Sequence, residues 1–195
     1  SVPSNAGKAR FYVESPSTEP QIALGTSGST DVMNVTSKNY GIKISESKSG
    51  DVSKNSVGIG YKSEASGYST TALGTYAKAS GNYATALGSY ANTSGSNSTA
   101  VGVHANANGS YAIALGDSAN ASGGYSTAVG DYAYAIGHST TALGKYSSAS
   151  KTSAIALGVS SNASGSYAIA LGSTANASGD NSTALGRHAK ARESN

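Results

Sequence analysis

Hydrophobic and polar positions alternate over short stretches of this chain, and the pattern restarts every 14 residues. Each period contains a segment such as Thr-Ala-Leu-Gly or Ile-Ala-Leu-Gly, in which a branched aliphatic residue stands directly before a glycine. A fixed period of this kind is typical of a solenoid built from one repeated coil. The anchor glycines that close the segments are Gly60, Gly74, Gly88, Gly102, Gly116, Gly130, Gly144, Gly158, Gly172 and Gly186.

The second half of each period also ends in glycine in most copies, as in the sequence Ala-Asn-Ala-Ser-Gly at residues 119–123. Lys151 and Glu193 replace this second glycine in two copies. Two glycines per period, with β-branched residues before the anchor, disfavour a helix, whereas alternation of side chains is typical of a strand. We therefore predict two short strands per 14-residue coil, joined by tight glycine turns, with successive coils stacked as parallel ladders.

Each strand before an anchor has two different faces, because residues two apart in a strand share a face. The residues one and three before the anchor are aliphatic or β-branched, and the residue between them is almost always alanine. We expect the aliphatic face to line the interior of the coil, with Leu115 buried between Val101 and Val129. The small-residue face would then contact other copies of the chain. One large aliphatic residue contributes ~2 kcal/mol, which does not offset about 1.5 kcal/mol of ordering cost per residue, so we expect oligomerisation.

Composition and charge exclude several classes of protein. The chain contains no cysteine, so it has no disulfide or thiolate metal framework. No stretch approaches the ~20 apolar residues of a membrane-spanning helix. The net charge of +3 is too small for a nucleic-acid-binding surface, which needs clustered lysine and arginine. No signal peptide begins at Ser1, and we therefore expect a mature protein or an excised piece.

Three copies of the motif resemble the repeat of a known family. Residues 55–63 read NSVGIGYKS, residues 97–105 read NSTAVGVHA, and residues 181–189 read NSTALGRHA. They are similar to the NSVAIGxxS repeat of YadA-like head domains, which belong to the trimeric autotransporter adhesins of Gram-negative bacteria. The resemblance covers residues 55–191 and rests on ten copies in phase, with Gly58 in place of the family's alanine.

This resemblance implies an all-β fold, a left-handed parallel β-roll (solenoid) of 14-residue coils assembled as a homotrimer. It implies a non-enzymatic adhesin head without a cofactor, which would be exposed on the outer membrane at the bacterial cell surface and act in virulence. The implied partner is a host extracellular-matrix protein, such as collagen, fibronectin or laminin, or a host cell receptor. The family's stalk and C-terminal membrane anchor are missing from this sequence. We interpret residues 55–191 as the head and residues 192–195 as the start of the connection to the neck or stalk.

The first 54 residues differ from the repeats. Residues 22–28 read IALGTSG and form one degenerate copy of the repeat, two and a half periods ahead of the array. We predict a short strand at residues 42–44 within an N-terminal cap or insertion that shields the open edge of the first coil. The alternative is a charged contact surface for a host ligand. Its candidate binding residues are Lys43, Lys48 and Lys54.

Tyrosine is the dominant aromatic residue, with 13 Tyr against one Phe and no Trp. The tyrosines recur in register two residues after the anchor and five residues before it, which predicts vertical ladders of rings. Stacked rings stabilise a solenoid, and tyrosine is also a favoured binding residue; these two roles are compatible. The candidate ligand-binding residues of the first position are Tyr76, Tyr90, His104, Tyr132 and Tyr146. The second position contains Tyr83, Tyr111, Tyr125 and Tyr167.

Neither the histidines nor the aspartates form a pattern that is typical of catalysis or metal binding. His104 and His188 occupy the position of the tyrosines, and no Ser/His/Asp or Cys/His arrangement accompanies them or His138. Asp117 and Asp131 are in register one residue after the anchor, but the chain lacks the GGxGxDxUx pattern of calcium-binding β-rolls. We therefore predict no enzyme, no metal site and no cofactor, and we interpret the two aspartates as turn residues.

Two other functions remain open as alternatives to an adhesin head. A column of threonines three residues before the anchor is reminiscent of an ice-binding solenoid, but isoleucine interrupts it at residues 113, 155 and 169. We expect these threonines to face inward, which disfavours ice binding. A structural spacer of a surface fibre without a ligand is the second alternative, and the sequence does not separate it from an adhesin.

Overall fold

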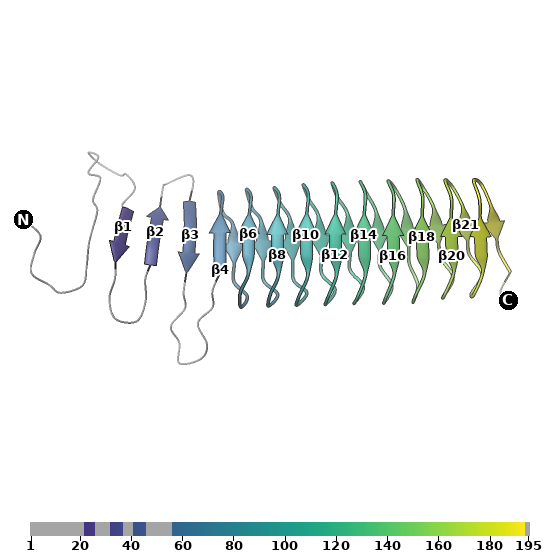
Figure 1. The fold of residues 1–195 in the computed structure, drawn as a ribbon, viewed down its shortest axis with the longest axis horizontal. Coiled ribbons are helices and arrows are strands. Elements are labelled where there is room, and N and C mark those ends of the chain that lie inside the picture. Colours follow the sequence, from purple (N-terminus) through teal and green to yellow (C-terminus); the bar gives the residue numbers. More distant parts are fainter. Residues whose placement is uncertain (1–21, 26–31, 37–40, 46–55, 194–195) are drawn as a thin grey trace, which may run out of the picture.

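The computed structural model describes residues 22–25, 32–36, 41–45 and 56–193, and of the first three ranges only the backbone. All secondary structure in the described residues is β-strand. Figure 1 shows one long stack of coils that runs from β4 to the C-terminal end, with β1, β2 and β3 beside its N-terminal end. The predicted parallel β-solenoid is confirmed.

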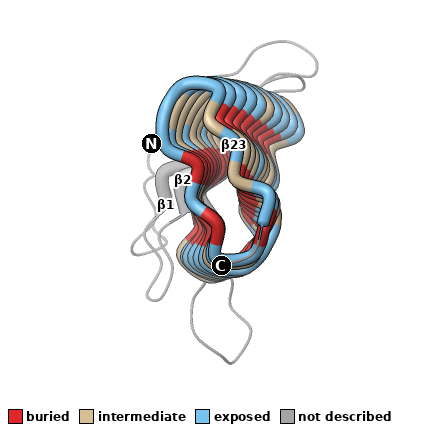
Figure 2. The backbone as a smooth tube through the Cα atoms, turned by 90° about the vertical axis from the view of Figure 1, so that its right-hand side faces the viewer, coloured by how far each residue is buried: buried red, intermediate tan, exposed pale blue. Residues whose placement is uncertain are grey.

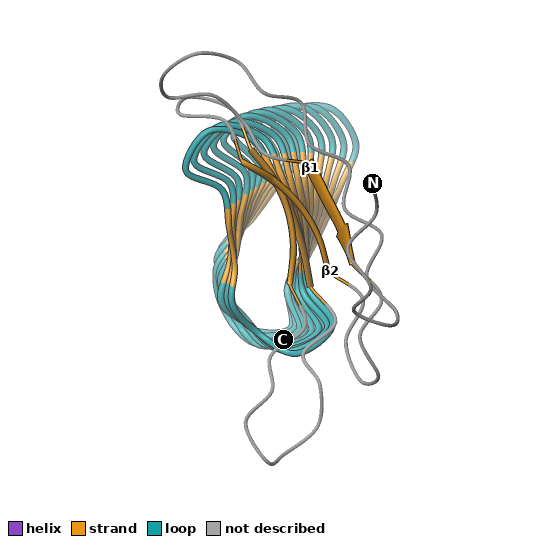
Figure 3. Cartoon of the chain, turned by 90° about the vertical axis from the view of Figure 1, so that its left-hand side faces the viewer, coloured by secondary structure: helices purple, strands orange, loops and turns teal. Residues whose placement is uncertain are grey.

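Every coil contributes one strand to each of two sheets, and Figure 3 shows the two layers facing each other. Neighbouring strands of the roll are parallel and pair one period apart, so that Thr99 lies opposite Ile113. Sheet A contains β4 (Ser56–Ile59), β6 (Thr71–Leu73), β8 (Thr85–Leu87), β10 (Thr99–Val101), β12 (Ile113–Leu115), β14 (Thr127–Val129), β16 (Thr141–Leu143), β18 (Ile155–Leu157), β20 (Ile169–Leu171) and β22 (Thr183–Leu185). Sheet B contains β5 (Glu64–Ala65), β7 (Lys78–Ala79), β9 (Asn92–Thr93), β11 (Asn106–Ala107), β13 (Asn120–Ala121), β15 (Tyr134–Ala135), β17 (Ser148–Ala149), β19 (Asn162–Ala163), β21 (Asn176–Ala177) and β23 (Lys190–Ala191).

Three antiparallel strands extend sheet A beyond the first coil: β1 (Ile22–Gly25), β2 (Val32–Thr36) and β3 (Gly41–Ser45). β3 pairs antiparallel with β4, with Ile42 opposite Ile59, and therefore occupies the edge of the first parallel strand. The strand predicted at residues 42–44 is confirmed as β3. The IALG segment of β1 pairs antiparallel with β2 and does not form a coil of the roll.

The interior of the roll consists of alanine, which corrects the expected assignment of the strand faces. Every buried hydrophobic residue in the described part of the chain is an alanine. In β12, Ala114 is fully buried, whereas Ile113 is 39% exposed and Leu115 is only partly buried. The expectation that Leu115 and the threonine column face inward is therefore wrong. In Figure 2 the buried positions recur at the same places in successive coils.

The physical reason is the short circumference of the coil. Both strands of a 14-residue coil send side chains into the same interior, and Ala112, Ala114, Ala119 and Ala121 of one coil are all fully buried. Two short strands joined by tight turns leave room for small side chains only, and interiors are close-packed. The larger side chains therefore point outward from sheet A. We call this outward surface of residues one and three before each anchor the aliphatic face.

Serine and threonine replace alanine at some interior positions because their hydroxyl groups find a partner inside the same turn. Ser98 Oγ donates to the carbonyl oxygen of Gly95 at 2.6 Å, and Thr140 Oγ1 donates to that of Gly137 at 2.7 Å. Ser182 repeats the bond with Gly179 at 2.6 Å. A buried hydroxyl with a hydrogen bond costs little, so the core tolerates these small polar residues.

Glycine recurs in both turns of the coil because the next coil passes very close, although Lys151 and Glu193 take its place in two second turns. Gly116 has φ +136°, and a Cβ atom on it would lie 2.6 Å from the carbonyl oxygen of Gly130. A Cβ atom on Gly109, in the second glycine series, would collide with the carbonyl oxygen of Gly123. The stacking distance between the coils therefore fixes both glycine series.

Candidate functional site

The predicted candidate residues lie in the turns, at a position with left-handed backbone. The residue two after each anchor has positive φ, for example 56° at Tyr76 and 53° at Tyr132. Its backbone N–H is held by the previous coil: the N–H of Tyr132 donates to the carbonyl oxygen of Asp117 at 2.9 Å. Each side chain at this position is therefore repeated at the same place in successive coils. We call this set the first-turn column.

Three rings of the first-turn column form a continuous stack. The centroids of Tyr76 and Tyr90 are 5.0 Å apart with an interplanar angle of 13°, and those of Tyr90 and His104 are 4.9 Å apart with an angle of 10°. Tyr61 meets Tyr76 edge-on at 5.5 Å. The predicted ladder is confirmed for these residues, and Tyr90 remains 48% exposed.

A second stack follows after one interruption. Tyr132 and Tyr146 stack with their centroids 5.5 Å apart and an angle of 24°. Between His104 and Tyr132 the column contains Ser118, whose φ of 54° matches that of the tyrosines. The column therefore consists of two groups of rings separated by one position without a ring.

A second column of tyrosines lies in the other turn, five residues before each anchor. Tyr111 and Tyr125 stack at 4.9 Å with an angle of 5°, and Tyr125 meets His138 edge-on at 5.6 Å. These tyrosines are also exposed, up to 60% at Tyr167. Because the two turns connect the sheets at opposite ends of the strands, the two columns lie on opposite edges of the roll.

Two lysines lie close to tyrosine rings of the first turns, Lys62 in the first coil and Lys145 further along the roll, and neither was among the predicted binding residues. Lys62 Nζ lies 5.4 Å from the ring centroids of both Tyr61 and Tyr76. Coulombic interactions with Tyr61 and then Tyr76 raise the pKa of Lys62 above its usual value. Lys145 Nζ lies 5.2 Å from the ring of Tyr146. The sequence contained a signal for this contact, because Lys62 directly follows Tyr61.

The proposed lysine surface falls mostly outside the described residues. Lys43 belongs to β3, and its backbone pairs with Asn34 on one side and Gly58 on the other. Its side chain is not described, and Lys48 and Lys54 lie outside the described residues. The lysine surface therefore stays a prediction.

The outward face of sheet B is polar and is held by hydrogen bonds between coils. Asn92 Nδ2 donates to Asn106 Oδ1 at 3.0 Å, and Asn162 Nδ2 donates to Asn176 Oδ1 at 3.3 Å. Sheet B therefore differs from the aliphatic face of sheet A, because pairs of its outward asparagines bond along the stack, although Asn120 Oδ1 has no partner among the described residues.

An ion pair crosses the second turns near the C-terminal end of the roll. The backbone N–H of Ser166 donates to Asp180 Oδ1 at 2.8 Å, and Lys151 Nζ lies 3.7 Å from the same oxygen. The hydrogen bond from Ser166 and the charge of Lys151 lower the pKa of Asp180. Lys151, which replaces a turn glycine, is therefore used for a surface contact between coils.

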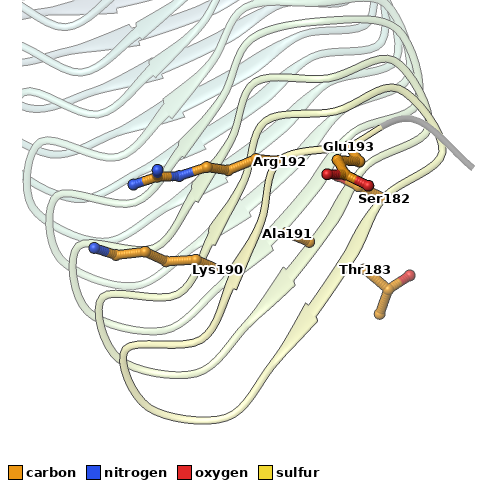
Figure 4. A pocket seen from close by; sticks show the side chains of 6 residues that line it. All are labelled: Ser182, Thr183, Lys190, Ala191, Arg192 and Glu193. Atoms are coloured by element: carbon orange, nitrogen blue, oxygen red, sulfur yellow. The ribbon is translucent and has the colours of Figure 1, made fainter.

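A hollow of about 570 Å³ lies at the C-terminal end of the roll. Figure 4 shows Lys190 and Arg192 extending from it on one side, with Ser182, Thr183 and Glu193 on the other. It is open to solvent and belongs to the last coil. No group of three or more His, Asp or Glu side chains in the described residues is arranged to hold a metal ion. Within the same residues, no helix is long and apolar enough to cross a membrane.

Comparison with protein families identifies the repeats. The YadA head domain repeat (2 copies) matches most of the roll, with matches at residues 53–77, 65–91, 79–105, 94–119, 107–133, 130–150, 149–175 and 163–189. The chain belongs to the YadA head family. A search of curated proteins found no relative of this YadA-like head.

Among solved structures, this YadA-like head is similar to the collagen-binding domain of the Yersinia adhesin YadA. The two are 27% identical, the match covers 71% of this chain and 70% of the other, and the TM-score is 0.49. The matched family repeats end at residue 189 and begin at residue 53, so they include the whole first-turn column from Lys62 to His188.

Proposed function

We propose that this chain is the head of a bacterial surface adhesin that binds a host matrix protein or a host receptor through its first-turn column. The observation that carries the proposal is the column of exposed rings from Tyr76 to Tyr146, repeated in register on a roll of YadA head repeats. Each ring offers apolar area and each tyrosine a hydroxyl group, at intervals set by the coils. Such a surface suits a repetitive ligand that is held weakly at many equivalent points. The proposal includes no enzymatic activity.

We further propose that three copies assemble through their aliphatic faces into a homotrimer of left-handed rolls. The face is continuous along sheet A and is exposed in the single chain: Leu143 is 45% exposed and Leu171 is 39% exposed. Exposed apolar stripes of this length are typical of interfaces. The alanine core adds little hydrophobic burial per coil, so burial of the aliphatic face would supply stability that one roll lacks. Assembly would also present the first-turn column in three copies.

The outward threonines do not favour ice binding. They face away from the core, contrary to the expectation from the sequence, but they alternate with the aliphatic residues of the same strands. In β12 the position contains Ile113, and in β14 Thr127 is followed two residues later by Val129. An ice-binding face needs a second column of threonine, and sheet A has an aliphatic column there.

The proposed binding surface is tested by comparing two variants in a solid-phase assay against collagen, fibronectin and laminin. In the first variant, Tyr76, Tyr90, Tyr132 and Tyr146 are changed to serine, which the column already accepts at Ser118 and Ser160. In the second, Lys43, Lys48 and Lys54 are changed to serine. We expect the tyrosine variant to lose at least about tenfold in affinity, as removal of several aromatic contacts does, and the lysine variant to bind nearly normally.

Salt dependence provides an independent measurement on the unmodified protein. Binding through the uncharged tyrosines should change little as salt is raised, whereas binding through lysines should weaken steeply. Loss of binding in the lysine variant alone would place adhesion in the N-terminal segment. Absence of binding to every matrix protein and to host cells would favour the structural spacer.

A further inference from the structure

The interruption of the first-turn column at Ser118 leaves a slot of the height of one ring. Successive rings in this column are 4.9 to 5.5 Å apart. His104 and Tyr132 are two coils apart, which corresponds to ~10 Å at the usual spacing between strands. Ser118 Oγ donates to Asp117 Oδ1 at 3.1 Å and so turns toward its neighbour in the chain. The facing sides of His104 and Tyr132 consequently have no stacked ring between them.

Two carboxylates stand beside this slot. Asp117 precedes Ser118 and Asp131 precedes Tyr132, each one residue after an anchor glycine, and both side chains are exposed. Neither forms an ion pair with a basic residue of the described chain. Lys145 occupies the same position one coil further on, but its Nζ lies over the ring of Tyr146. The slot therefore combines two flat aromatic walls with two negative charges at its side.

We propose that this slot binds the guanidinium group of an arginine side chain from a partner protein. A guanidinium is planar, stacks on aromatic rings and donates paired hydrogen bonds to a carboxylate. It would take the place of the absent ring between His104 and Tyr132 while its edge faces Asp117 and Asp131. The ammonium group of lysine has no plane to stack on the rings, and an uncharged aromatic ring has no positive charge for the two carboxylates. The inference rests on the proposed function, since it names the side chain that one point of the adhesive column accepts.

The feature is specific to this place in the roll. The other serine of the column, Ser160, follows Tyr146, but the next coil contributes Thr174 and not a second ring. Its neighbours in the chain are Val159 and Ser161, without a carboxylate. Ser160 therefore provides a matched control with the same backbone conformation, since its φ is 54°, as at Ser118.

The test is a titration of the full chain with a blocked arginine tripeptide, Ac-Gly-Arg-Gly-NH2. The chain contains three histidines, so NMR with labelled histidine rings gives a small set of signals, and His104→Asn assigns the one of interest. We expect a saturable shift of the His104 signal and little change at His188. The affinity of the corresponding lysine tripeptide should be lower by a factor of about five or more, because an ammonium group has no plane that stacks on the rings. The neutral citrulline tripeptide, which has nearly the same shape, should not shift the signal.

Substitutions distinguish the slot from unspecific attraction to a negative surface. Ser118→Tyr fills the slot with a ring that its neighbours accept at the same φ, and it should abolish the arginine-dependent shift. Ser160→Tyr should leave that shift unchanged. Asp117→Asn combined with Asp131→Asn should weaken binding at least about fivefold, since both charges are removed. Retained binding in Ser118→Tyr, or equal shifts with citrulline, would overturn the proposal.

The result is independent of the matrix-binding assay. If arginine binds as expected and no matrix protein does, the slot stands and the proposed adhesive function fails. If matrix proteins bind equally well to the unmodified chain and to Ser118→Tyr, and arginine does not shift His104, the adhesive function stands and the slot fails.

Discussion

At the scale of single residues, the coil depends on which positions have no space for a side chain. Glycine is favoured where the backbone of the next coil passes closest, and a small residue, mostly alanine, is required where both sheets share the interior. Tyrosine occupies turn positions with left-handed φ, which a bulky residue rarely adopts. Backbone hydrogen bonds to the neighbouring coils hold each turn in this conformation. The stacked tyrosine rings add to the stability of the turns.

A comparison of two glycines in neighbouring second turns tests the packing argument. Gly109→Ala should destabilise the chain by roughly 3 kcal/mol or more, because its Cβ atom would collide with the Gly123 backbone of the next coil. Gly124→Ala should change stability by about 0.5 kcal/mol or less, since its Cβ atom would meet the His138 side chain at 3.3 Å and no backbone atom closer than 4.0 Å. Denaturant unfolding measures both. Equal losses would contradict the role given to the coil spacing.

Adjacent residues of β12 test which strand face is the core. Ala114→Asp places an unpaired charge in the interior and should cost roughly 3 kcal/mol or more. Leu115→Asp points outward and should leave the β-sheet circular dichroism intact, while it weakens association between chains. Thermal melts and sedimentation equilibrium on both variants separate the two effects. If Leu115→Asp unfolds the coil and Ala114→Asp does not, the opposite face of β12 forms the core.

At the scale of secondary-structure elements, the first and last strands of a stack of coils each have one edge without a parallel neighbour. β3 pairs antiparallel with β4 and thereby satisfies the edge of the first parallel strand of sheet A. Unpaired strand edges bind other chains, and lysine on an edge strand opposes this. In the full chain both edges of β3 are paired, with β2 and with β4, so Lys43, the central residue of β3, would lie on an edge strand only after β1 and β2 are removed.

Two truncations of the N-terminal segment test the role of β3. A chain that begins at Gly41 loses β1 and β2 but keeps the strand paired with β4, and it should remain dispersed. A chain that begins at Asn55 exposes β4 and should associate end to end. Light scattering over time at equal concentrations compares them. If the shorter chain stays dispersed, β3 is not needed to protect the edge.

At the scale of the whole molecule, the two sheets present different outward surfaces. Sheet B presents asparagines, some of which bond along the stack, whereas the described part of sheet A presents a branched aliphatic residue before every anchor, beside threonine, isoleucine or valine. The tyrosine columns lie on the two edges between the sheets. This arrangement leaves the aliphatic face for assembly and the edges for contacts with other molecules.

The proposed assembly predicts a definite mass. Sedimentation equilibrium at micromolar concentration should give about three times the chain mass of 19.2 kDa, because the large aliphatic faces bury best around a common axis. Replacing Leu115, Leu143 and Leu157 together by serine should reduce this mass. As a control, replacing Ser94, Ser122 and Ser164, which directly follow strands of sheet B, by alanine should leave the mass unchanged. A stable folded monomer of the unmodified chain would contradict the proposed trimer.

The sequence by itself determined the coil length, the two strands per coil, the position of both turns and the register of the tyrosines. These features follow from spacing along the chain, and parallel stacking converts a fixed spacing into vertical columns. The resemblance of residues 55–63, 97–105 and 181–189 to the NSVAIGxxS repeat also identified the family. The strand at residues 42–44 followed from its alternation of apolar and polar residues.

Only the tertiary structure decided which face of each strand is inside. Alternation in Thr-Ala-Leu or Ile-Ala-Leu separates two faces but does not orient them, and hydrophobicity alone favoured Leu115 for the core. The closeness of the two sheets overrides that preference, because only Ala114 fits between them. The same holds for the slot at Ser118: the sequence shows a serine in a series of rings, but the distances between the stacked rings define the space that it leaves.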